Sequence, residues 1–440
     1  MFKSVKGKIL LPFFILSTSL VAQVTTVSPY SRLGLGDLLP QGYARQMGFG
    51  QASLALPQPI NIDFSNPASY QALELVTLEA GLEYTQLRLQ QDNPPINSEN
   101  SRSGFRYLAV GLPVTNWYGT SLGLRPYSFK GYEIVTNRTL EADPTVEIED
   151  AFLGEGGLNQ VYWGNAFRIG NSLSLGINAS YLWGNLRELR RVNFLDGSFF
   201  DTQTEDEITV GGLLLEYGAQ YQHNYGNDFY LSGAVAMSLA TDIDATRLNY
   251  QYTLNGNEIT DTLKGGFTEN GTLTIPGELK MGLSWGRNHS AILNPAWAIN
   301  LDYELYQGSS FTDFQGDNPL NDGYRLQVGG FMVPRFSIKK WERSNLYFNN
   351  MEYRLGAFYE ETPLVVDGQT IENYGITFGF GLPIKQRSQA PGEVRITTLN
   401  IGFNYGQRGT LQNDLIREEY WAFYLGLTFS NKWFIDYKYR

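Results

Sequence analysis

Fourteen segments of the 440-residue chain alternate apolar residues with small polar ones, and this period of two is the feature that most constrains the fold. Residues 172–184, for example, read SLSLGINASYLWG. In an extended strand Tyr181 and Trp183 fall on one face, while Asn178 and Ser180 fall on the other. The apolar face would pack into the core of a soluble sandwich, but it would face lipid in a membrane barrel. The pattern therefore predicts an all-β fold and leaves these two architectures open.

The connections between the segments favour the barrel. The alternating segments are 75–89, 103–114, 118–135, 158–168, 172–183, 208–222, 228–238, 275–285, 296–306, 324–332, 351–360, 374–383, 395–406 and 419–430. In the first half of the chain, the connections between them are alternately long and short. Barrels of the bacterial outer membrane have short periplasmic turns, long external loops and an even number of strands. A sandwich gives no reason for sorting loop length by end.

The composition of the polar faces indicates which side of the wall is turned toward lipid. In residues 374–383, Gly375, Thr377 and Gly379 alternate with aromatic and aliphatic residues. The solvated face of a sandwich would usually carry Lys and Glu instead. Aromatic residues such as Trp421 stand toward the ends of segments, as in the interfacial girdles of membrane proteins. We therefore predict a transmembrane antiparallel β-barrel of about 14 strands, with its apolar side toward lipid and its small polar side toward the lumen.

The two ends of the chain differ from the barrel. In residues 1–23, three lysines precede an apolar run that ends in small residues, the layout of a secretory signal peptide that is cleaved on export. Residues 24–72 have no sustained alternation and are predicted to form a hatch, or plug, inside the lumen of a barrel made by residues 73–430. Residues 431–440 are predicted to form a periplasmic tail or a short extra strand. The location that follows is the outer membrane.

The side-chain chemistry argues against an enzyme. The chain has no cysteine and two histidines, His223 and His289, which we predict in or beside periplasmic turns. No catalytic triad, metal site or cofactor is therefore expected. The formal net charge of −11 argues against nucleic-acid binding, which needs a basic face.

Two sets of charged residues fall in the connections. The acidic residues are predicted in external loops, as solvated charge or as weak sites for divalent ions that bridge lipopolysaccharide. The basic residues are predicted on the periplasmic side, in a soluble turn or where an envelope partner or peptidoglycan could meet them. The acidic set is Glu147, Glu149, Asp150, Glu205, Asp206 and Glu207, and the basic set is Lys339, Lys340, Arg343, Lys385 and Arg387.

Several stretches resemble the FadL family of outer-membrane transporters for hydrophobic compounds, in the form common among Bacteroidetes. They are the small-residue stretch 47–55, the motif Asn66-Pro67-Ala68 before the first strand, IPGELKMGLSW at 275–285 and MEYRLGAFYEETPL at 351–364. The resemblance implies a barrel closed by an N-terminal hatch. It also implies that the Asn-Pro-Ala motif lies against an inward kink in the third strand, beside a gap through which apolar ligands leave sideways into the bilayer.

The third segment itself supports a gap. Pro126 stands in its middle, and proline gives no ladder hydrogen bond, so it is excluded from central strands except at bulges. The wall should therefore be perturbed there, next to Gly119, Gly123 and Arg125. The alternative is that Pro126 stands in a strand extension above the membrane.

Two functions follow from the resemblance. In the first, the barrel is a passive channel: a hydrophobic small molecule passes over apolar residues of the hatch and enters the bilayer beside the third strand. The hatch residues on this path would be Phe49, Leu54, Ile62 and Phe64, beside Asn66, Pro67 and Ala68. In the second, the barrel does not transport but is a subunit of an outer-membrane secretion or assembly machine, as FadL-like barrels of Bacteroidetes are in type IX secretion. The expected partners are outer-membrane lipid and lipopolysaccharide, with the small molecule or envelope proteins in addition.

Overall fold

The computed structural model describes residues 28–197, 199–226, 228–256, 258–289, 292–334, 347–384 and 395–432. The predicted signal peptide, most of the predicted tail and the five basic residues predicted on the periplasmic side lie outside the described residues, as does the side chain of His289.

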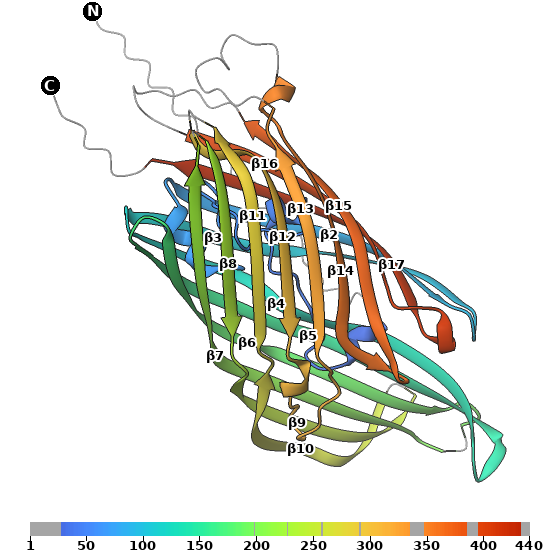
Figure 1. The fold of residues 1–440 in the computed structure, drawn as a ribbon. Coiled ribbons are helices and arrows are strands. Elements are labelled where there is room, and N and C mark those ends of the chain that lie inside the picture. The colour runs from blue at the N-terminus through green and yellow to red at the C-terminus, as the bar shows by residue number, and fades with distance from the viewer. Residues whose placement is uncertain are drawn as a thin grey trace, which may run out of the picture.

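One antiparallel sheet closes on itself into a barrel of 14 strands (Figure 1). The strands are β2 (Val76–Gln91), β3 (Ile96–Thr115), β4 (Tyr118–Leu140), β5 (Asp143–Ile169), β6 (Leu173–Phe194), β7 (Asp201–Tyr225), β8 (Phe229–Ser238), β11 (Glu278–His289), β12 (Ile292–Tyr306), β13 (Gly323–Met332), β14 (Glu352–Val366), β15 (Gln369–Ile384), β16 (Arg395–Arg408) and β17 (Arg417–Asn431). The last strand pairs with the first, from Arg417 opposite Gln90 to Asn431 opposite Val76. The predicted fold class is confirmed, and each predicted segment lies on one of these strands.

The two faces of the wall are those that the sequence predicts. On β6, Asn178 and Ser180 are fully buried, while Tyr181 is half exposed on the outside. The exposed outer surface carries large apolar residues from every part of the barrel, such as Leu122, Leu213 and Leu283. Such a continuous apolar surface matches the lipid-facing band of a transmembrane barrel. None of the helices in the described ranges is long and apolar enough to cross a membrane.

The long connections that were predicted as loops are mostly strand, so this part of the prediction was wrong. β4 to β7 continue beyond the predicted segments at one end of the barrel, here called the outer end, and residues 239–274 form a hairpin of β9 (Thr241–Asn255) and β10 (Glu258–Ile275). β9 extends the wall by pairing with β7. In parts of these extensions, such as residues 135–139 of β4 and 258–263 of β10, successive residues are exposed, so these parts lack the alternation by which a membrane strand is recognised.

The acidic residues predicted in loops therefore lie in strands, and several of them form ion pairs across the sheet. Asp150 lies 2.5 Å from Arg138, and Glu205 lies 2.6 Å from Arg187. Opposite charges on neighbouring strands stabilise a sheet modestly. These carboxylates thus already have cationic partners.

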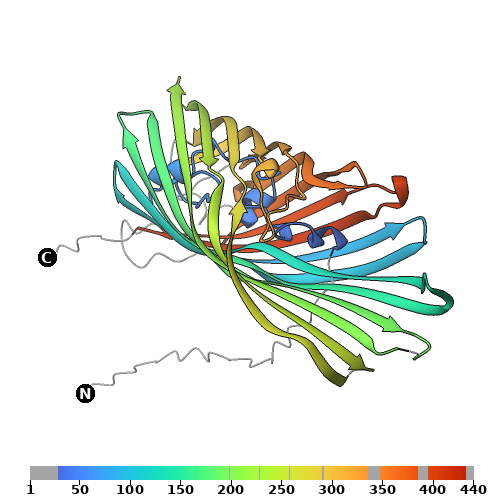
Figure 2. The ribbon, with the colours of Figure 1, turned by 90° about the horizontal axis from the view of Figure 1, so that it is seen from below.

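The N-terminal residues 28–75 lie inside the barrel (Figure 2). They form the 3₁₀ helices η1 (Pro29–Arg32) and η2 (Pro67–Ala72), the short strand β1 (Asp37–Leu38) and one turn of helix, α1 (Ala44–Met47). Nearly all of residues 42–72 are buried. This segment explains why glycine recurs on the inner face: a Cβ on Gly329 would stand 1.9 Å from the carbonyl oxygen of Phe49, and one on Gly176 would stand 2.4 Å from the carbonyl carbon of Pro67.

Candidate functional site

The barrel wall splits between its second and third strands. β3 pairs with β4 only from Thr115 opposite Tyr118 to Leu108 opposite Leu124. Beyond that point, toward the outer end, β3 pairs only with β2 and β4 only with β5 among the strands of the wall. Pro126 lies where the two strands part, and a bulge follows it between Pro126 and Ser128. The wall is therefore perturbed at the proline, where it can form no ladder hydrogen bond.

The N-terminal segment occupies the edge of β4 that β3 leaves free. β1 pairs antiparallel with β4, with Asp37 opposite Phe129 and Leu38 opposite Ser128. The backbone N–H of Leu39 donates to the carbonyl of Tyr127 at 2.9 Å, and that of Ser28 donates to the carbonyl of Gly131 at 3.1 Å. A strand of the filling segment thus takes the place of a wall strand.

Two arginines hold this segment from the two sides of the split. Arg125 of β4 donates from Nη2 to the carbonyl oxygens of Leu39 and Pro40, at 3.1 and 3.2 Å. Arg106 of β3 donates from its own Nη2 to the Pro40 carbonyl, and its Nη1 lies 3.1 Å from Glu83. Hydrogen bonds from charged groups each contribute about 1.5–3 kcal/mol, so this clasp is strong.

The Asn-Pro-Ala motif begins η2. The Oδ1 of Asn66 accepts from the N–H of Ala68 at 3.0 Å, and its Nδ2 donates to the carbonyl of Leu54 at 2.7 Å. Pro67 and Ala68 lie against β6 and β7, where the inner faces carry glycines. The resemblance places the motif against the third strand, β4; in this structure the carbonyl of Tyr70, four residues later, lies against Gly119 of β4.

The apolar residues predicted along a ligand path are buried, and the path itself stays a prediction. Phe49, Leu54, Ile62 and Phe64 are all buried between the segment and the wall. The Phe64 ring meets the ring of Tyr162 edge-on, and the guanidinium of Arg125 lies over the Phe64 ring, 4.8 Å from its centroid. Gly123 gives room to the same tyrosine ring. Of the residues predicted for the site, Arg125 lines the central cavity.

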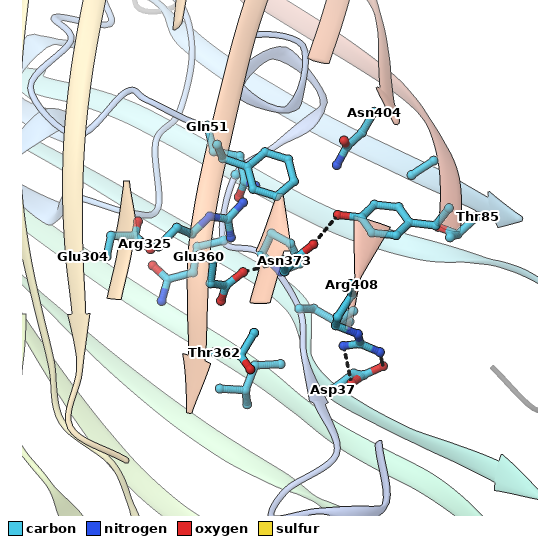
Figure 3. A pocket seen from close by; sticks show the side chains of 18 of the residues that line it. Asp37, Gln51, Thr85, Glu304, Arg325, Glu360, Thr362, Asn373, Asn404 and Arg408 are labelled. Atoms are coloured by element: carbon cyan, nitrogen blue, oxygen red, sulfur yellow. Dashed lines mark hydrogen bonds and ion pairs between the residues drawn. The ribbon is translucent and has the colours of Figure 1, made fainter. Parts of the chain in front are cut away.

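The central cavity has a volume of about 240 Å³ and lies between the N-terminal segment and the inner faces of several strands (Figure 3). Five basic and five acidic side chains line it. They are Arg102, Arg125, Lys280, Arg325 and Arg408, and Asp37, Glu278, Glu304, Glu360 and Glu418. Arg408 lies 2.9 Å from Asp37 and 2.6 Å from Glu418. The cavity therefore combines these charged groups with a lining surface that is more apolar than polar, to which side chains such as Leu38 and Phe358 contribute.

A buried ion triad holds the N-terminal segment at α1. Its residues were not among those predicted for the site from the sequence. Arg45 of α1 lies 3.0 Å from Glu352 of β14, and Arg354 of the same strand lies 2.7 Å from that carboxylate. The sequence does single out Glu352 and Arg354, because they stand at inward positions of an otherwise apolar alternation. It does not identify Arg45 as their partner, because Arg45 is far away in the chain.

A buried carboxyl also organises the segment from within. Asp63 accepts hydrogen bonds from Ser53 at 2.6 Å, Gln58 at 2.7 Å and Ser65 at 2.6 Å. Burial raises the pKa of Asp63 above its ordinary value, although these hydrogen bonds to the charged form act in the opposite direction. The loop between α1 and η2 is thereby tied into one unit.

Comparison with known proteins agrees with this architecture. The model of the BamG family matches residues 1–440. A FadL homologue of Pseudomonas aeruginosa is similar in structure, with a TM-score of 0.53, 12% identity, and 90% of this chain and 98% of that chain covered. The toluene transporter TodX of Pseudomonas putida gives a TM-score of 0.52 at 12% identity, with 90% and 99% covered. No curated protein matches the chain. At this identity the likeness to the two structures shows a shared fold, a FadL-like barrel.

Proposed function

The chain belongs to the BamG family, and from this membership we propose that it is a plugged, FadL-like barrel of the outer membrane that serves as a subunit of an outer-membrane assembly machine. The family name supports a role in such a machine. The FadL-like fold alone does not choose between transport and assembly, because one fold hosts many functions.

The observation that carries this proposal is the filling of the lumen by a segment that buried charges hold. A usual site for an apolar ligand has only a few polar groups, whereas ten charged side chains stand beside the apolar lining of this cavity. A passing hydrocarbon gains about 0.8 kcal/mol for each buried CH₂. Breaking one buried ion pair by removing a partner costs about 3–5 kcal/mol. An apolar ligand of few carbons therefore does not displace the segment readily.

Free strand edges at the outer end supply surfaces for a protein partner. Within the described residues, β3 from Ile96 to Arg106 has no strand on its β4 side, and β10 pairs along one edge with β9 and meets a single bridge on the other, Thr274 with Thr312. Unpaired strand edges readily accept another chain. In this proposal, these edges are where the partner protein binds.

The test is purification of the tagged full chain from native outer membranes in mild detergent. Stoichiometric outer-membrane partners support the proposal, and a lone barrel with co-purified lipid contradicts it. Because the chain has no cysteine, one added thiol reports contacts cleanly. Ser101→Cys on the free edge of β3 should cross-link to the partner, while Thr370→Cys, at the paired β14–β15 hairpin, is the matched control.

A second candidate function is passive uptake of hydrophobic small molecules with lateral release. The split between β3 and β4 favours it, because a gap in the wall is a route from the lumen to the bilayer. In this reading β1 would have to leave the edge of β4 before a ligand could pass. Uptake of a radiolabelled monoaromatic hydrocarbon into reconstituted vesicles that rises with the barrel, and falls when a disulfide joins β1 to β4, would establish this function.

The remaining expectations belong to the same proposal. The barrel lies in the outer membrane after removal of residues 1–23, in contact with lipid and lipopolysaccharide, and its apolar outer surface supports this location. It has no catalytic activity and needs no cofactor, and the similarity of its fold to the toluene transporter TodX supports this part of the proposal. Mass spectrometry of the mature N-terminus tests the cleavage.

A further inference from the structure

Two of the free strand edges at the outer end differ in how open they are to a further strand. The pairing of β10 with β9 is interrupted by three shifts of register between Ile259 and Phe267, and β10 carries Lys264, Gly265 and Gly266 in that stretch. Bulges and lysines are devices by which proteins keep another strand from adding to a free edge. The edge of β10 is therefore the less suited of the two to strand addition.

The free edge of β3 lacks these devices along the described residues 96–105. From Ile96 to Phe105 the strand pairs with β2 without a shift of register, and this stretch contains no lysine and no proline. A Cβ added to Gly104 would meet no atom within 4 Å, so there is open space beside the strand at this point. Edges of this kind accept another strand through their unpaired backbone N–H and C=O groups.

The side chains of this stretch indicate that the edge lies in water. Glu99, Ser101 and Ser103 are exposed and alternate with half-buried residues, so the outward face of the stretch is polar. A free edge within the hydrocarbon layer would leave backbone groups without hydrogen bonds, at a cost of several kcal/mol for each group. Water satisfies these groups until a partner replaces it. A partner of this edge therefore approaches from the aqueous side.

The directions of the neighbouring strands decide how a partner strand would run. β1 and β3 both pair antiparallel with β4, so β1 and β3 run in the same direction. A strand that lies between them and runs the other way is antiparallel to both, which restores the alternating order of the wall. Antiparallel pairs are also slightly more stable per residue than parallel pairs. The tips of the β2–β3 hairpin, in light blue, and the β4–β5 hairpin, in teal, lie apart at the outer end (Figure 1, Figure 2).

We propose that an extended segment of a partner protein adds to β3 as a further strand, antiparallel to β3, along residues 96–105. An extended polypeptide offers N–H and C=O groups at the spacing that a strand edge requires, so the partner is a protein segment. The edge from Ile96 to Phe105 is longer than the usual strand of about 5–6 residues, so it can hold a whole strand. The segment belongs to a subunit of the assembly machine, so the inference rests on the proposed function.

Binding of a synthetic strand to the purified full chain in detergent tests this inference without a partner. The probe is the fluorescein-labelled peptide Lys-Thr-Val-Thr-Val-Thr-Val-Lys, and in the control peptide proline replaces the middle valine. Proline lacks the N–H group that a strand ladder needs. We expect saturable binding of the probe and at least ~10-fold weaker binding of the control, which corresponds to about 1.4 kcal/mol.

An added thiol shows where the peptide binds. A nitroxide attached to Ser101→Cys, on the free edge of β3, should quench the fluorescence of the bound peptide. A nitroxide attached to Thr370→Cys, at the paired β14–β15 hairpin, should not. Equal quenching at the two positions would place the peptide elsewhere and overturn the inference.

Two proline variants of β3 complete the test. Successive residues of a strand direct their backbone groups to opposite edges, so Asn100→Pro and Ser101→Pro remove one donor from the free edge and one from the ladder with β2. At least one folded variant should bind the probe at least ~10-fold more weakly than the unaltered chain. The heat-modifiable mobility of the barrel on a gel checks folding. If neither variant folds, the control peptide and the nitroxide pair decide.

The outcomes separate this inference from the proposed function. Absence of saturable binding up to about 1 mM peptide, or unchanged binding by both folded proline variants, would overturn strand addition even if partners co-purify with the barrel. A barrel that binds the probe at β3 but co-purifies without partners would contradict the assembly role alone.

Discussion

Arg106 and Arg125, on the two strands that part at the split, donate hydrogen bonds to the same carbonyl oxygen, that of Pro40. The backbone of the N-terminal segment thus joins two strands that no longer pair with each other. The strength of the wall at this point depends on a residue that is not part of the wall.

The first prediction concerns this clasp. Arg125→Ala removes the hydrogen bonds to Leu39 and Pro40 and should lower the stability of the barrel by about 1.5–3 kcal/mol for each charged hydrogen bond lost, less any relaxation. Thermal unfolding in detergent measures the change. An unchanged midpoint would mean that β1 alone holds the edge of β4.

A second prediction concerns the whole filling segment. A chain without residues 24–72 should conduct small polar solutes faster than the full chain in planar bilayers, because the inner face that it exposes is polar. Single-channel conductance is the measurement, and the full chain in the same membrane is its control. Equal conductance would show that the segment does not block the lumen.

The buried triad leads to a third prediction. Glu352→Gln leaves Arg45 and Arg354 without their shared carboxylate and should destabilise the barrel by about 3–5 kcal/mol. Glu155→Gln is the control, since its ion pair with Arg187 is more than a third exposed on both sides and contributes about 0–1 kcal/mol. Denaturant unfolding of both variants compares them; similar losses would argue against a structural role for the triad.

The fourth prediction uses the glycines of the inner face. A Cβ on Gly356 would stand 2.3 Å from the carbonyl carbon of Phe49, so Gly356→Ala should displace the segment and expose it to protease. Gly233→Ala is the matched variant, because there the nearest atom would be 3.6 Å away. Limited proteolysis, with the protease added at the outer end, measures how fast the segment is cleaved in each variant. Cleavage at the same rate in both would contradict the close packing.

The membrane part of the fold could be predicted because lipid imposes alternation on every strand that crosses it. The outer extensions of β4 to β7 could not, since parts of them, such as residues 135–139 of β4, are exposed at successive positions and show no such alternation. At the site, Pro126 revealed the parting of the wall by its missing N–H. Arg45 and Glu352 gave no joint signal, because a contact between residues so far apart in the chain depends on the closed fold. Phe64 and the other apolar residues predicted along a ligand path are buried in the filled lumen, and the path stays a prediction.

The pairing of β1 with β4 also constrains the order in which the molecule is built. The filling segment precedes β2 in the chain and touches strands on every side, and the seam between β17 and β2 joins the last wall strand of the described residues to the first. A segment so enclosed is captured as the sheet curls around it, rather than threaded through a finished ring. We therefore expect the strands of the barrel to assemble around the N-terminal segment, which acts as a template inside the closing sheet.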